Sequence, residues 1–376
     1  MMAPRFRSYV LVSLDQIARN YRNVRGAVGP GIEVMAVVKA DAYGHGALEV
    51  SRALIGEGAE WLAVSSVDEG AALRSAGITT RILVMAGFLS QEREAVVEHQ
   101  LTPTAHSLED IAELDRMAER AGRPLAFHLK IDSGMGRLGT RAEPAEIVAA
   151  LRALRHARIE GLMTHFASAA DFTSPQTDAQ MARFQACYQA LEEAGIPVDC
   201  VHTSSTNAIG YARRGGWYNM VRAGHALYGY VSPARGAGPR QILDVQPALT
   251  WKAKILAVKE IPEGTLVGYG GTFRAPSAMR IAILGAGYAD GVFHRLSNRG
   301  KVIAAGQIAP IVGTISMDLT TIDVSHAPQL KPGDDVTLLG AEGEVSLDAQ
   351  QIARVAGTIS YNILSSISAR VRRVYV

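Results

Sequence analysis

Eight short apolar runs alternate with stretches of helical periodicity between residues 33 and 225, and this alternation constrains the fold most strongly. The runs begin near residues 33, 61, 81, 101, 125, 158, 198 and 218. Short apolar runs are typical of buried strands, and strands that alternate with helices form parallel sheets. Eight strand and helix units within about 200 residues predict a (β/α)8 barrel of the TIM type. We therefore expect an α/β fold that starts with this barrel.

Two of the intervening stretches carry the helical pattern clearly. In residues 107–122, Ser107 and Asp110 predict a capping box at the start of a helix. Residues 177–195 repeat the helical period, and the apolar side chains expected on one face are Met181, Phe184, Tyr188 and Leu191.

The pattern changes after the Gly/Pro-rich stretch "GYVSPARGAGPR" at residues 229–240. Alternating segments with turn signals then predict strands within 248–261, 279–289, 300–306, 308–324 and 334–340. Helical periodicity returns only in residues 346–368. We expect a barrel domain over residues 1–235 and a mainly β domain over 236–376, and the early segment 8–14 could pair with the sheet of the second domain.

Composition narrows the class of function. The chain has 376 residues, 48% of them hydrophobic, and a formal net charge of +2. No basic stripe indicates nucleic-acid binding, no run approaches the roughly 20 apolar residues of a membrane span, and no secretory signal is evident. Cys187 and Cys200 are too few for a disulfide framework, and no metal-ligand spacing occurs. We expect a cytoplasmic protein with a small-molecule partner, no metal, and both cysteines buried.

Lys39 is the first candidate for chemistry, because the apolar run at residues 34–38 leads straight into it. The active site of such a barrel lies at the carboxyl ends of its strands. Burial there lowers the pKa of a lysine and frees its amine to form a Schiff base. The alternative is a buried stem whose charged head reaches solvent. Position alone does not separate the two.

Three further motifs follow expected strands. "HTSSTN" at residues 202–207, together with Arg222 and Gly224, matches the place where barrels often bind phosphate. Phosphate binding combined with a Schiff-base lysine indicates pyridoxal phosphate. "HLKIDSGMGRLG" at 128–139 supplies Lys130 and Arg137, and Arg137 could hold a carboxylate. His165 follows the sixth strand. Each of these motifs, taken alone, also fits an ordinary loop.

Taken together, the motifs closely resemble those of bacterial alanine racemases along nearly the whole chain. The matching segments, in the order of that family, are "AVVKADAYGHG", "HLKIDSGMGRLG", "GLMTHFASA", "NMVRAGHALYG", "VGYGGTF", "GAGYADG", "VGTISMD" and "GTISYNILSSISARV". The resemblance implies a pyridoxal 5′-phosphate (PLP) enzyme of fold type III that interconverts L-alanine and D-alanine, supplies D-alanine for peptidoglycan, and works as a homodimer whose active sites are shared between subunits.

The resemblance also implies a role for each matching residue. Lys39 would carry the cofactor and act as one base, and Tyr269 of the partner subunit would be the base on the opposite face. Two bases suit racemisation, because one removes a proton and the other returns it from the far side. His165 and Arg222 would favour the phenolate of Tyr269. Arg222 would also face the pyridine nitrogen and leave it largely unprotonated.

Cofactor and substrate contacts are implied in the same way. The cofactor phosphate would be held by Tyr43, Ser205, Thr206, Gly224, His225 and Tyr361. Arg137 and the partner subunit's Met317 would hold the substrate carboxylate. Lys130 would orient Arg137 if it is carbamylated, and Tyr288 and Asp318 would line the entrance.

The chain departs from the family pattern near the phosphate and the entrance. "HTSSTN" stands where "HAANSA" is expected, and Ala223, Gly224 and His225 replace Pro-Gly-Ile. Other departures are Ala170 beside Asp171, His294, Thr314 and Asn362. They predict altered electrostatics at the entrance with the same reaction.

Four alternatives remain open at this point. They are an amino-acid racemase of broader specificity, a fold type III PLP decarboxylase of basic amino acids, a non-catalytic cofactor-binding protein, and a cofactor-free aldolase. Arg222 disfavours the decarboxylase, for which an acidic residue is expected at that position. The domain that carries Tyr269 and Met317 disfavours the non-catalytic protein.

Overall fold

The computed structural model describes residues 5–376 and divides into two compact units. The barrel unit comprises residues 17–42 and 47–246. The β unit comprises the described residues up to Gln16, the short segment Tyr43–Gly46, and Pro247–Val376. The chain therefore contributes to the β unit three times, although Tyr43–Gly46 is surrounded in sequence by barrel residues.

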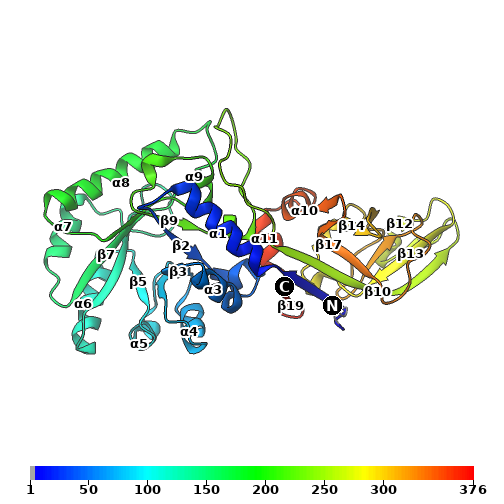
Figure 1. Ribbon diagram of the computed structural model, residues 1–376, viewed down its shortest axis with the longest axis horizontal. Coiled ribbons are helices and arrows are strands. Elements are labelled where there is room, and N and C mark those ends of the chain that lie inside the picture. Colours follow the sequence, from blue (N-terminus) through cyan, green and yellow to red (C-terminus); the bar gives the residue numbers. More distant parts are fainter. Residues whose placement is uncertain (1–4) are drawn as a thin grey trace. The chain divides into compact units, whose positions relative to one another are not determined.

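The barrel unit contains one eight-stranded parallel sheet, which confirms the predicted (β/α)8 architecture (Figure 1). Its spatial order is β8-β7-β6-β5-β4-β3-β2-β9. A single parallel bridge between Ser205 and Arg222 brings β8 beside β9, so the barrel is nearly closed. The strands are β2 (Glu33–Val37), β3 (Trp61–Val64), β4 (Arg81–Val84), β5 (Thr102–Ala105), β6 (Leu125–Lys130), β7 (Ala157–Met163), β8 (Cys200–His202) and β9 (Met220–Ala223).

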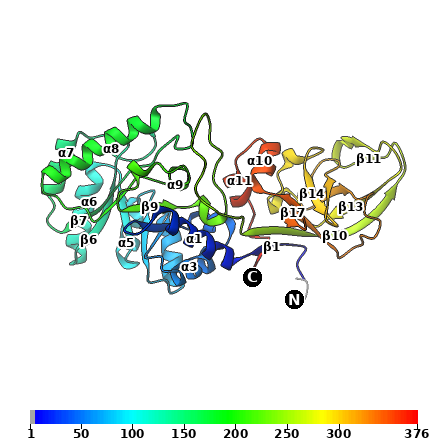
Figure 2. The same cartoon turned by 45° about the horizontal axis from the view of Figure 1, so that its top comes forward.

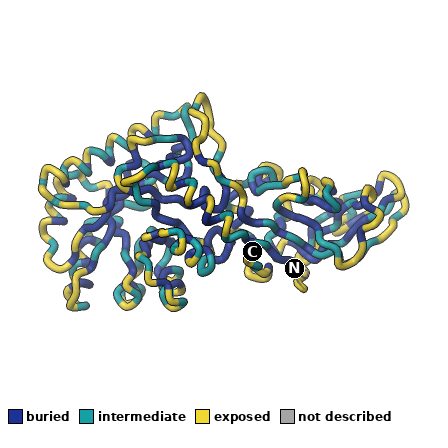
Figure 3. The backbone as a smooth tube through the Cα atoms, viewed as in Figure 1, coloured by how far each residue is buried: buried dark blue, intermediate teal, exposed yellow. Residues whose placement is uncertain are grey.

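Side chains from strands that are not neighbours meet inside this barrel. Trp61 of β3 packs on His128 of β6 with 5.1 Å between ring centroids, and His128 Nδ1 lies 2.8 Å from His202 Nε2 of β8. Contacts of this kind require the side chains to point inward. The strands are coloured as buried along most of their length in Figure 3, whereas exposed residues gather at loops and on the outer faces of helices.

Helices lie outside the strands; Figure 2 shows α6, α7 and α8 on the flank next to β6 and β7. The helices that begin between Leu14 and Thr206 are α1 (Leu14–Val28), α2 (Lys39–Gly44), α3 (Ala47–Gly56), α4 (Val67–Ser75), α5 (Arg93–Glu98), α6 (Leu108–Ala121), α7 (Pro144–Arg152), α8 (Gln176–Glu193) and α9 (Thr206–Gly210). Short 3-10 turns occur at η1 (Ser90–Glu92), η2 (Arg214–Gly216) and η3 (His225–Tyr228).

The helix caps only partly follow the predicted pattern. Ser107 Oγ accepts from Asp110 N at 3.0 Å, as expected for an N-cap, but the Asp110 carboxylate accepts from His106 N rather than from Ser107 N. The reciprocal half of the predicted capping box is therefore wrong; such boxes use the longer Glu or Gln at this position. A complete capping box forms instead between Ser66 and Glu69 at α4.

The predicted apolar face of α8 is correct only in part. Phe184 and Leu191 are buried, whereas Met181 and Tyr188 are half-buried. Cys187 completes the buried face, and it and Cys200 are both buried free thiols, as expected.

Helix α2 has an unusual backbone. Ala40, Asp41, Ala42 and Tyr43 all have φ between 52° and 54°, so this turn is left-handed. Left-handed helical backbone costs about 1–2 kcal/mol per non-glycine residue, and it rarely occurs in consecutive residues. The Asp41 carboxylate accepts from Ala47 N at 2.8 Å and so ties the turn to the start of α3. Strain of this kind persists only where surrounding contacts hold it, and it gathers at functional sites.

The β unit is built around the long strand β10. β10 pairs with β1, β13 and β17, and β1 in turn pairs in parallel with β19. The strands of this unit are β1 (Ser8–Val12), β10 (Leu249–Ile261), β11 (Leu266–Val267), β12 (Phe273–Arg274), β13 (Met279–Leu284), β14 (Lys301–Ala304), β15 (Gln307–Pro310), β16 (Thr320–Asp323), β17 (Asp335–Glu342), β18 (Val345–Leu347) and β19 (Arg372–Tyr375). Its helical segments are α10 (Ala349–Ala356), α11 (Ser360–Ser365), η4 (Tyr269–Gly271), η5 (Tyr288–Asp290) and η6 (His294–Leu296).

One predicted strand is interrupted. The segment 308–324 forms two strands, β15 and β16, separated by irregular backbone that contains Met317. Gly313 has φ of 79° there, and Ser316 Oγ accepts from Leu319 N at 3.1 Å, so a turn replaces the ladder. The apolar pattern alone did not reveal this turn.

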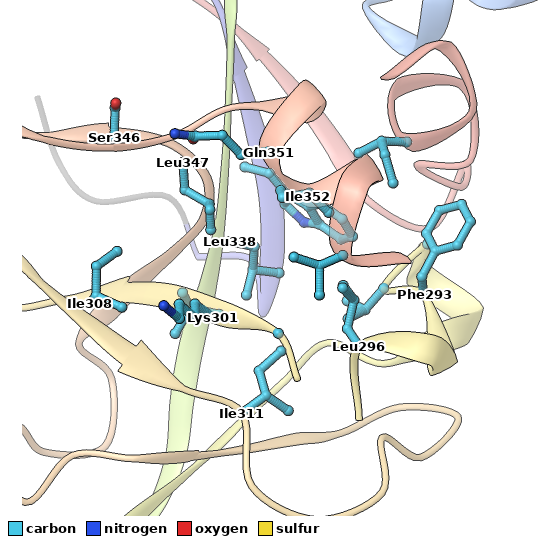
Figure 4. A pocket seen from close by; sticks show the side chains of 17 residues that line it. Phe293, Leu296, Lys301, Ile308, Ile311, Leu338, Ser346, Leu347, Gln351 and Ile352 are labelled. Carbon is cyan, nitrogen blue, oxygen red and sulfur yellow. The ribbon is translucent and has the colours of Figure 1, made fainter. Parts of the chain in front are cut away.

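The β unit also holds an apolar pocket of about 300 Å³ (Figure 4). Phe293, Leu296, Ile311, Leu338 and Ile352 project toward it. Lys301 is the only ionisable residue among those that line it. The pocket therefore lacks the paired acid and base groups that proton transfer at carbon needs. No helix within residues 5–376 combines the length and apolarity that crossing a bilayer would take.

Gly44 of the "ADAYGHG" motif is required by packing within the β unit. A Cβ atom on Gly44, which has φ of +81°, would lie 2.4 Å from Leu364 O. We predict that Gly44→Ala lowers the free energy of unfolding by about 3 kcal/mol, measured by urea titration with circular dichroism. Gly77→Ala is the control, because Gly77 has φ of +88° but open space around its Cβ; it should lose about 1 kcal/mol. Equal losses would contradict the clash with Leu364.

Candidate active site

The predicted chemistry-bearing residues of the barrel gather at the carboxyl ends of its strands. Lys39 begins the turn after β2, Lys130 ends β6, His165 follows β7, Ser205 and Thr206 follow β8, and Arg222 lies in β9. Because the strands are parallel, these ends form one rim. The electrostatic coupling of His165 to Arg222, Lys130, Arg137 and Lys39 places all five groups near one another.

Lys39 is positioned by a carboxylate that sequence reasoning missed. Glu69 Oε1 accepts from Ala40 N at 2.7 Å, and Glu69 Oε2 accepts from Ser65 N at 2.7 Å. Glu69 thus joins the left-handed turn to the start of α4. Burial lowers the pKa of Lys39, and the nearby Arg137 lowers it further. Within residues 5–376 the Lys39 amine has no hydrogen-bond or ion-pair partner.

Arg222 is the most confined cation of the site. It is 2% exposed, and burial lowers its pKa to about 10. One terminal nitrogen donates to His202 Nδ1 (2.8 Å) and His202 O (2.7 Å), and the other donates to Thr164 O (2.7 Å) and Thr203 O (3.1 Å). A guanidinium has five N–H groups. Nε–H alone has no partner among the described residues, and it can donate to a ligand.

His165 contacts the same guanidinium. Its Nδ1 lies 3.4 Å from a terminal nitrogen of Arg222. Thr164 O and Thr203 O already receive the two hydrogens of that nitrogen, so His165 makes only a shared third contact with it. A lone pair on Nδ1 is the form that suits a neighbouring cation, and a neutral His165 then carries its proton on Nε2. Burial and then Arg222 lower the pKa of His165 to about 3. His165 therefore stays neutral and offers an Nε2–H group to an acceptor.

Lys130 lies beside these cations and is 5% exposed. Burial and then Arg222 and Arg137 lower its pKa to about 8, whereas Asp132 opposes the shift. The Asp132 carboxylate itself is held by Gly134 N, Gly136 N and Arg141. Asp132 therefore shapes the glycine-rich loop, and Lys130 has no ion-pair partner within residues 5–376.

Arg137 stands on that loop and is exposed. No hydrogen-bond or ion-pair partner for Arg137 occurs in the part of the chain that the structure describes. Lys39, Lys130, Arg137 and Arg222 thus form a basic cluster whose chemistry favours an anionic ligand.

The expected phosphate residues are close together at β8 and β9. The Thr206 hydroxyl accepts from Gly224 N (3.2 Å) and Ala226 N (3.1 Å), so its own proton remains available. The Ser205 hydroxyl has no hydrogen-bond partner among residues 5–376. The His225 ring is buried and stacks on Tyr230, with ring centroids 5.1 Å apart.

The remaining predicted residues belong to the β unit. The Tyr43 and Tyr361 rings lie 6.0 Å apart within it. Tyr269, Met317 and Tyr288 are exposed by 75%, 53% and 45% respectively.

Asp318, which was predicted to line the entrance, pairs with Arg370 at 2.7 Å. Residues at the departures from the family pattern also have local partners. Asp171, next to Ala170, lies 3.5 Å from Arg235. The remaining contacts are Thr314 Oγ1 donating to Tyr269 O (3.0 Å), Asn362 Nδ2 donating to Thr358 Oγ1 (2.9 Å), and the His294 ring 6.2 Å from that of Tyr288.

The rim fits PLP by the chemistry of its donors. A phosphate group needs N–H and O–H donors, which Ser205 and Thr206 supply. A pyridine nitrogen needs one donor, which Arg222 Nε–H supplies. An aldehyde carbon needs a neutral amine, which the depressed pKa of Lys39 favours.

Comparison with known proteins identifies the family. The family model described as "Alanine racemase, N-terminal domain" matches residues 12–233, and "Alanine racemase, C-terminal domain" matches residues 248–375. An alanine racemase from Carboxydothermus hydrogenoformans is 40% identical over 97% of this chain and 98% of its own length. One from Synechocystis sp. is 38% identical over 99% of this chain and 100% of its own.

Solved structures agree. Alanine racemase from Clostridium difficile 630 superposes with a TM-score of 0.93 at 34% identity, covering 100% of this chain and 97% of that one. The enzyme from Bartonella henselae, described with covalently bound pyridoxal phosphate, gives a TM-score of 0.87 at 27% identity, covering 98% of this chain and 99% of that one.

The fold and the rim define a PLP-dependent enzyme with a TIM-type barrel and a mainly β unit. The chain belongs to the alanine racemase family, and its activity is that of an isomerase.

The neutral His165 predicts a loss of stability in acid. The folded chain takes up this proton only near pH 3, whereas the unfolded chain takes it up near pH 6.5. The unfolded state therefore binds more protons between these values, and stability falls as the pH drops, by up to about 1.4 kcal/mol per pH unit. We predict that His165→Asn makes the decline in thermal midpoint between pH 7 and pH 5 shallower. Parallel declines in wild type and variant would contradict this assignment.

Proposed function

We propose that this enzyme interconverts L-alanine and D-alanine with two bases, Lys39 and Tyr269 of the partner subunit, and supplies D-alanine for peptidoglycan. The observation that carries the proposal is the Lys39 amine. It lies at the carboxyl rim of the barrel, burial lowers its pKa, and it has no hydrogen-bond or ion-pair partner among the described residues. An amine in this state can attach a carbonyl compound and later accept a proton.

PLP, when bound, withdraws electrons from the substrate carbon and so makes its proton removable. Ser205, Thr206 and Gly224 would hold the phosphate, and the resemblance adds Tyr43, His225 and Tyr361. Arg222 would donate Nε–H to the ring nitrogen. A guanidinium keeps its proton, so Arg222 leaves that nitrogen a lone-pair acceptor and limits the electron withdrawal. Brief carbanion character suits racemisation better than decarboxylation or transamination.

Tyr269 is suited to act on a neighbouring subunit. Its side chain is 75% exposed on a turn framed by Gly268, Gly270 and Gly271, all with positive φ. A phenol with the usual pKa of about 10 needs stabilisation of its anion to serve as a base near neutral pH. His165 Nε2–H, oriented by Arg222, would donate to the phenol oxygen and provide it. A homodimer with shared sites follows.

Arg137 and the partner subunit's Met317 would position the substrate carboxylate. Arg137 has no anionic partner of its own, so a bidentate contact with a carboxylate is open to it. Carbamylation of Lys130 would turn a repelling neighbour into an anion that orients Arg137. Tyr288 and Asp318 would line the entrance. His294 and Thr314, which depart from the family pattern there, would allow the enzyme to accept a broader range of amino acids than alanine alone.

The two-base assignment predicts separate effects for two variants in deuterated water. Lys39→Ala should abolish both loss of optical rotation and deuterium uptake at the alanine α-carbon. Tyr269→Phe should retain the cofactor absorption but lower kcat for racemisation by about 10²–10⁴-fold, the usual contribution of one general acid-base group. Tyr188→Phe removes the same hydroxyl from α8 and should match wild type. Unchanged racemisation in Tyr269→Phe would refute its role.

Mixing the two inactive variants tests whether Tyr269 acts across subunits. A mixed dimer of Lys39→Ala and Tyr269→Phe chains has one site with both residues intact. Random reassociation should therefore restore about one quarter of wild-type activity, because half of the dimers are mixed and each has one complete site of two. No recovery after confirmed exchange of subunits would mean that Tyr269 acts within its own chain.

The depressed pKa of Lys130 predicts carbamylation. A neutral amine attacks carbon dioxide, forms an N–C bond and releases one proton, so the carbamate should accumulate as the pH rises through about 8. In holoenzyme equilibrated with 13C-bicarbonate, we expect a carbamate 13C signal that disappears in Lys130→Arg. Lys252→Arg, at a half-buried lysine of β10, should keep it. A wild-type spectrum without the signal would exclude the modification.

A further inference from the structure

Three buried ionisable residues that the proposed reaction does not use lead from Arg222 through the barrel interior. Arg222 donates to His202 Nδ1 at 2.8 Å, and His202 Nε2 lies 2.8 Å from His128 Nδ1. His128 Nε2 then faces Glu160 Oε2 at 3.8 Å. Both histidines are 0% exposed and Glu160 is 2% exposed. We call the set Glu160, His128 and His202 the interior relay.

The relay crosses the barrel from end to end. Arg222 lies near the end of β9, at the rim that carries Lys39. At the other end, Glu160 forms ion pairs with Arg81, the first residue of β4, and with Arg158. The Arg81 guanidinium lies 3.9 Å from the ring centroid of Trp61, the first residue of β3, and Trp61 packs on His128. The relay therefore anchors a rim residue to the opposite end of the barrel.

Hydrogen-bond chemistry fixes the direction of the relay. Arg222 can only donate, so His202 Nδ1 must accept, and a neutral His202 carries its proton on Nε2. That proton is donated to His128 Nδ1, so His128 also carries its proton on Nε2, facing Glu160. Reversing either ring would set two N–H groups against each other. Burial lowers the pKa of both histidines, which keeps them neutral.

Arg222 needs such an arrangement because it is a buried cation without a nearby anion. No carboxylate lies within 4.0 Å of its guanidinium among residues 5–376. An unpaired buried charge is strongly destabilising unless hydrogen bonds and a counter-charge offset it. Glu160 is the carboxylate that the relay faces: His128 Nε2 and Glu160 Oε2 lie 3.8 Å apart, and neither atom has a hydrogen-bond partner among the described residues.

We propose that Glu160, acting through the fixed tautomers of His128 and His202, is a remote positioning group that holds Arg222 with Nε–H directed toward the cofactor ring. This inference rests on the proposed function, which places Arg222 at the ring nitrogen. His202 accepts both hydrogens of one terminal nitrogen of Arg222, one at Nδ1 and one at its carbonyl oxygen. These two bonds prevent the guanidinium from turning a different edge toward the rim.

Proton positions in the wild-type holoenzyme test the relay without any substitution. Neutron diffraction from deuterium-exchanged crystals should show a deuteron on Nε2 of both His128 and His202 and none on either Nδ1. A deuteron on Nδ1 of either ring would overturn the proposal, because the chain of donors would then be broken between Arg222 and Glu160.

Removing the carboxylate charge tests its effect on Arg222. Glu160→Gln keeps the shape of the side chain, and we expect kcat to fall by about 5- to 30-fold, with KM for alanine changed by less than about 2-fold. The absorption band of the bound cofactor should shift. Glu113→Gln is the matched control: Glu113 is also a buried carboxylate, it pairs with Arg93, Arg116 and Arg120, and it has no link to the relay. It should leave all three quantities unchanged.

The two sets of results separate the relay from the proposed function. If Glu160→Gln behaves as Glu113→Gln does while the wild type racemises alanine, the relay is wrong and the proposed function stands. If the wild type does not racemise alanine, the proposed function fails, whereas the deuteron positions on His128 and His202 still support or overturn the relay.

Discussion

The site depends on how a buried guanidinium is held. Arg222 commits four of its five N–H groups to oxygens and a ring nitrogen at the ends of β7 and β8, and its own strand is β9. These bonds exist only if β8 and β9 come together, which the bridge between Ser205 and Arg222 accomplishes. Barrel closure therefore also sets the direction in which Arg222 Nε–H points. Burial, and then the charge of the same Arg222, keep His165 neutral.

A second constraint acts on Lys39. Its chain leaves β2 and enters a left-handed turn of four non-glycine residues, which local propensity opposes. Glu69 accepts from Ala40 N at the start of this turn, and Asp41 within the turn accepts from Ala47 N beyond its end. The strained turn sets where the Lys39 stem begins, while burial and the neighbouring arginines set the pKa of its amine. Rigid backbone and a depressed pKa together give a positioned nucleophile rather than a mobile surface lysine.

Much of the barrel could be predicted from sequence, because buried parallel strands leave a strong apolar signal and each of the eight expected strands is present. The rim residues Lys39, Lys130 and Arg222 could be placed for the same reason. His128 had a signal that was not used: it lies two residues before Lys130 on one strand and so points to the same side. Glu69 had none beyond an ordinary capping box. The role of Tyr269 rested on family resemblance, since the sequence of one chain cannot show what a second chain contributes. The left-handed turn was not predictable, because alanines disfavour this conformation and Asp, which tolerates it, adopts it as a single residue and not within a run.

The order of its strands along the chain determines when the sheet of the β unit can form during synthesis. Strand β1 is made first, yet both of its neighbours in the sheet, β10 and β19, come from the last third of the chain. During synthesis β1 stays unpaired until β10 has been made, and it gains its second neighbour only when β19 has been made. All eight barrel strands, β2 to β9, precede β10 in the chain. A nascent chain can therefore complete the parallel sheet of the barrel before the sheet of the β unit begins to form.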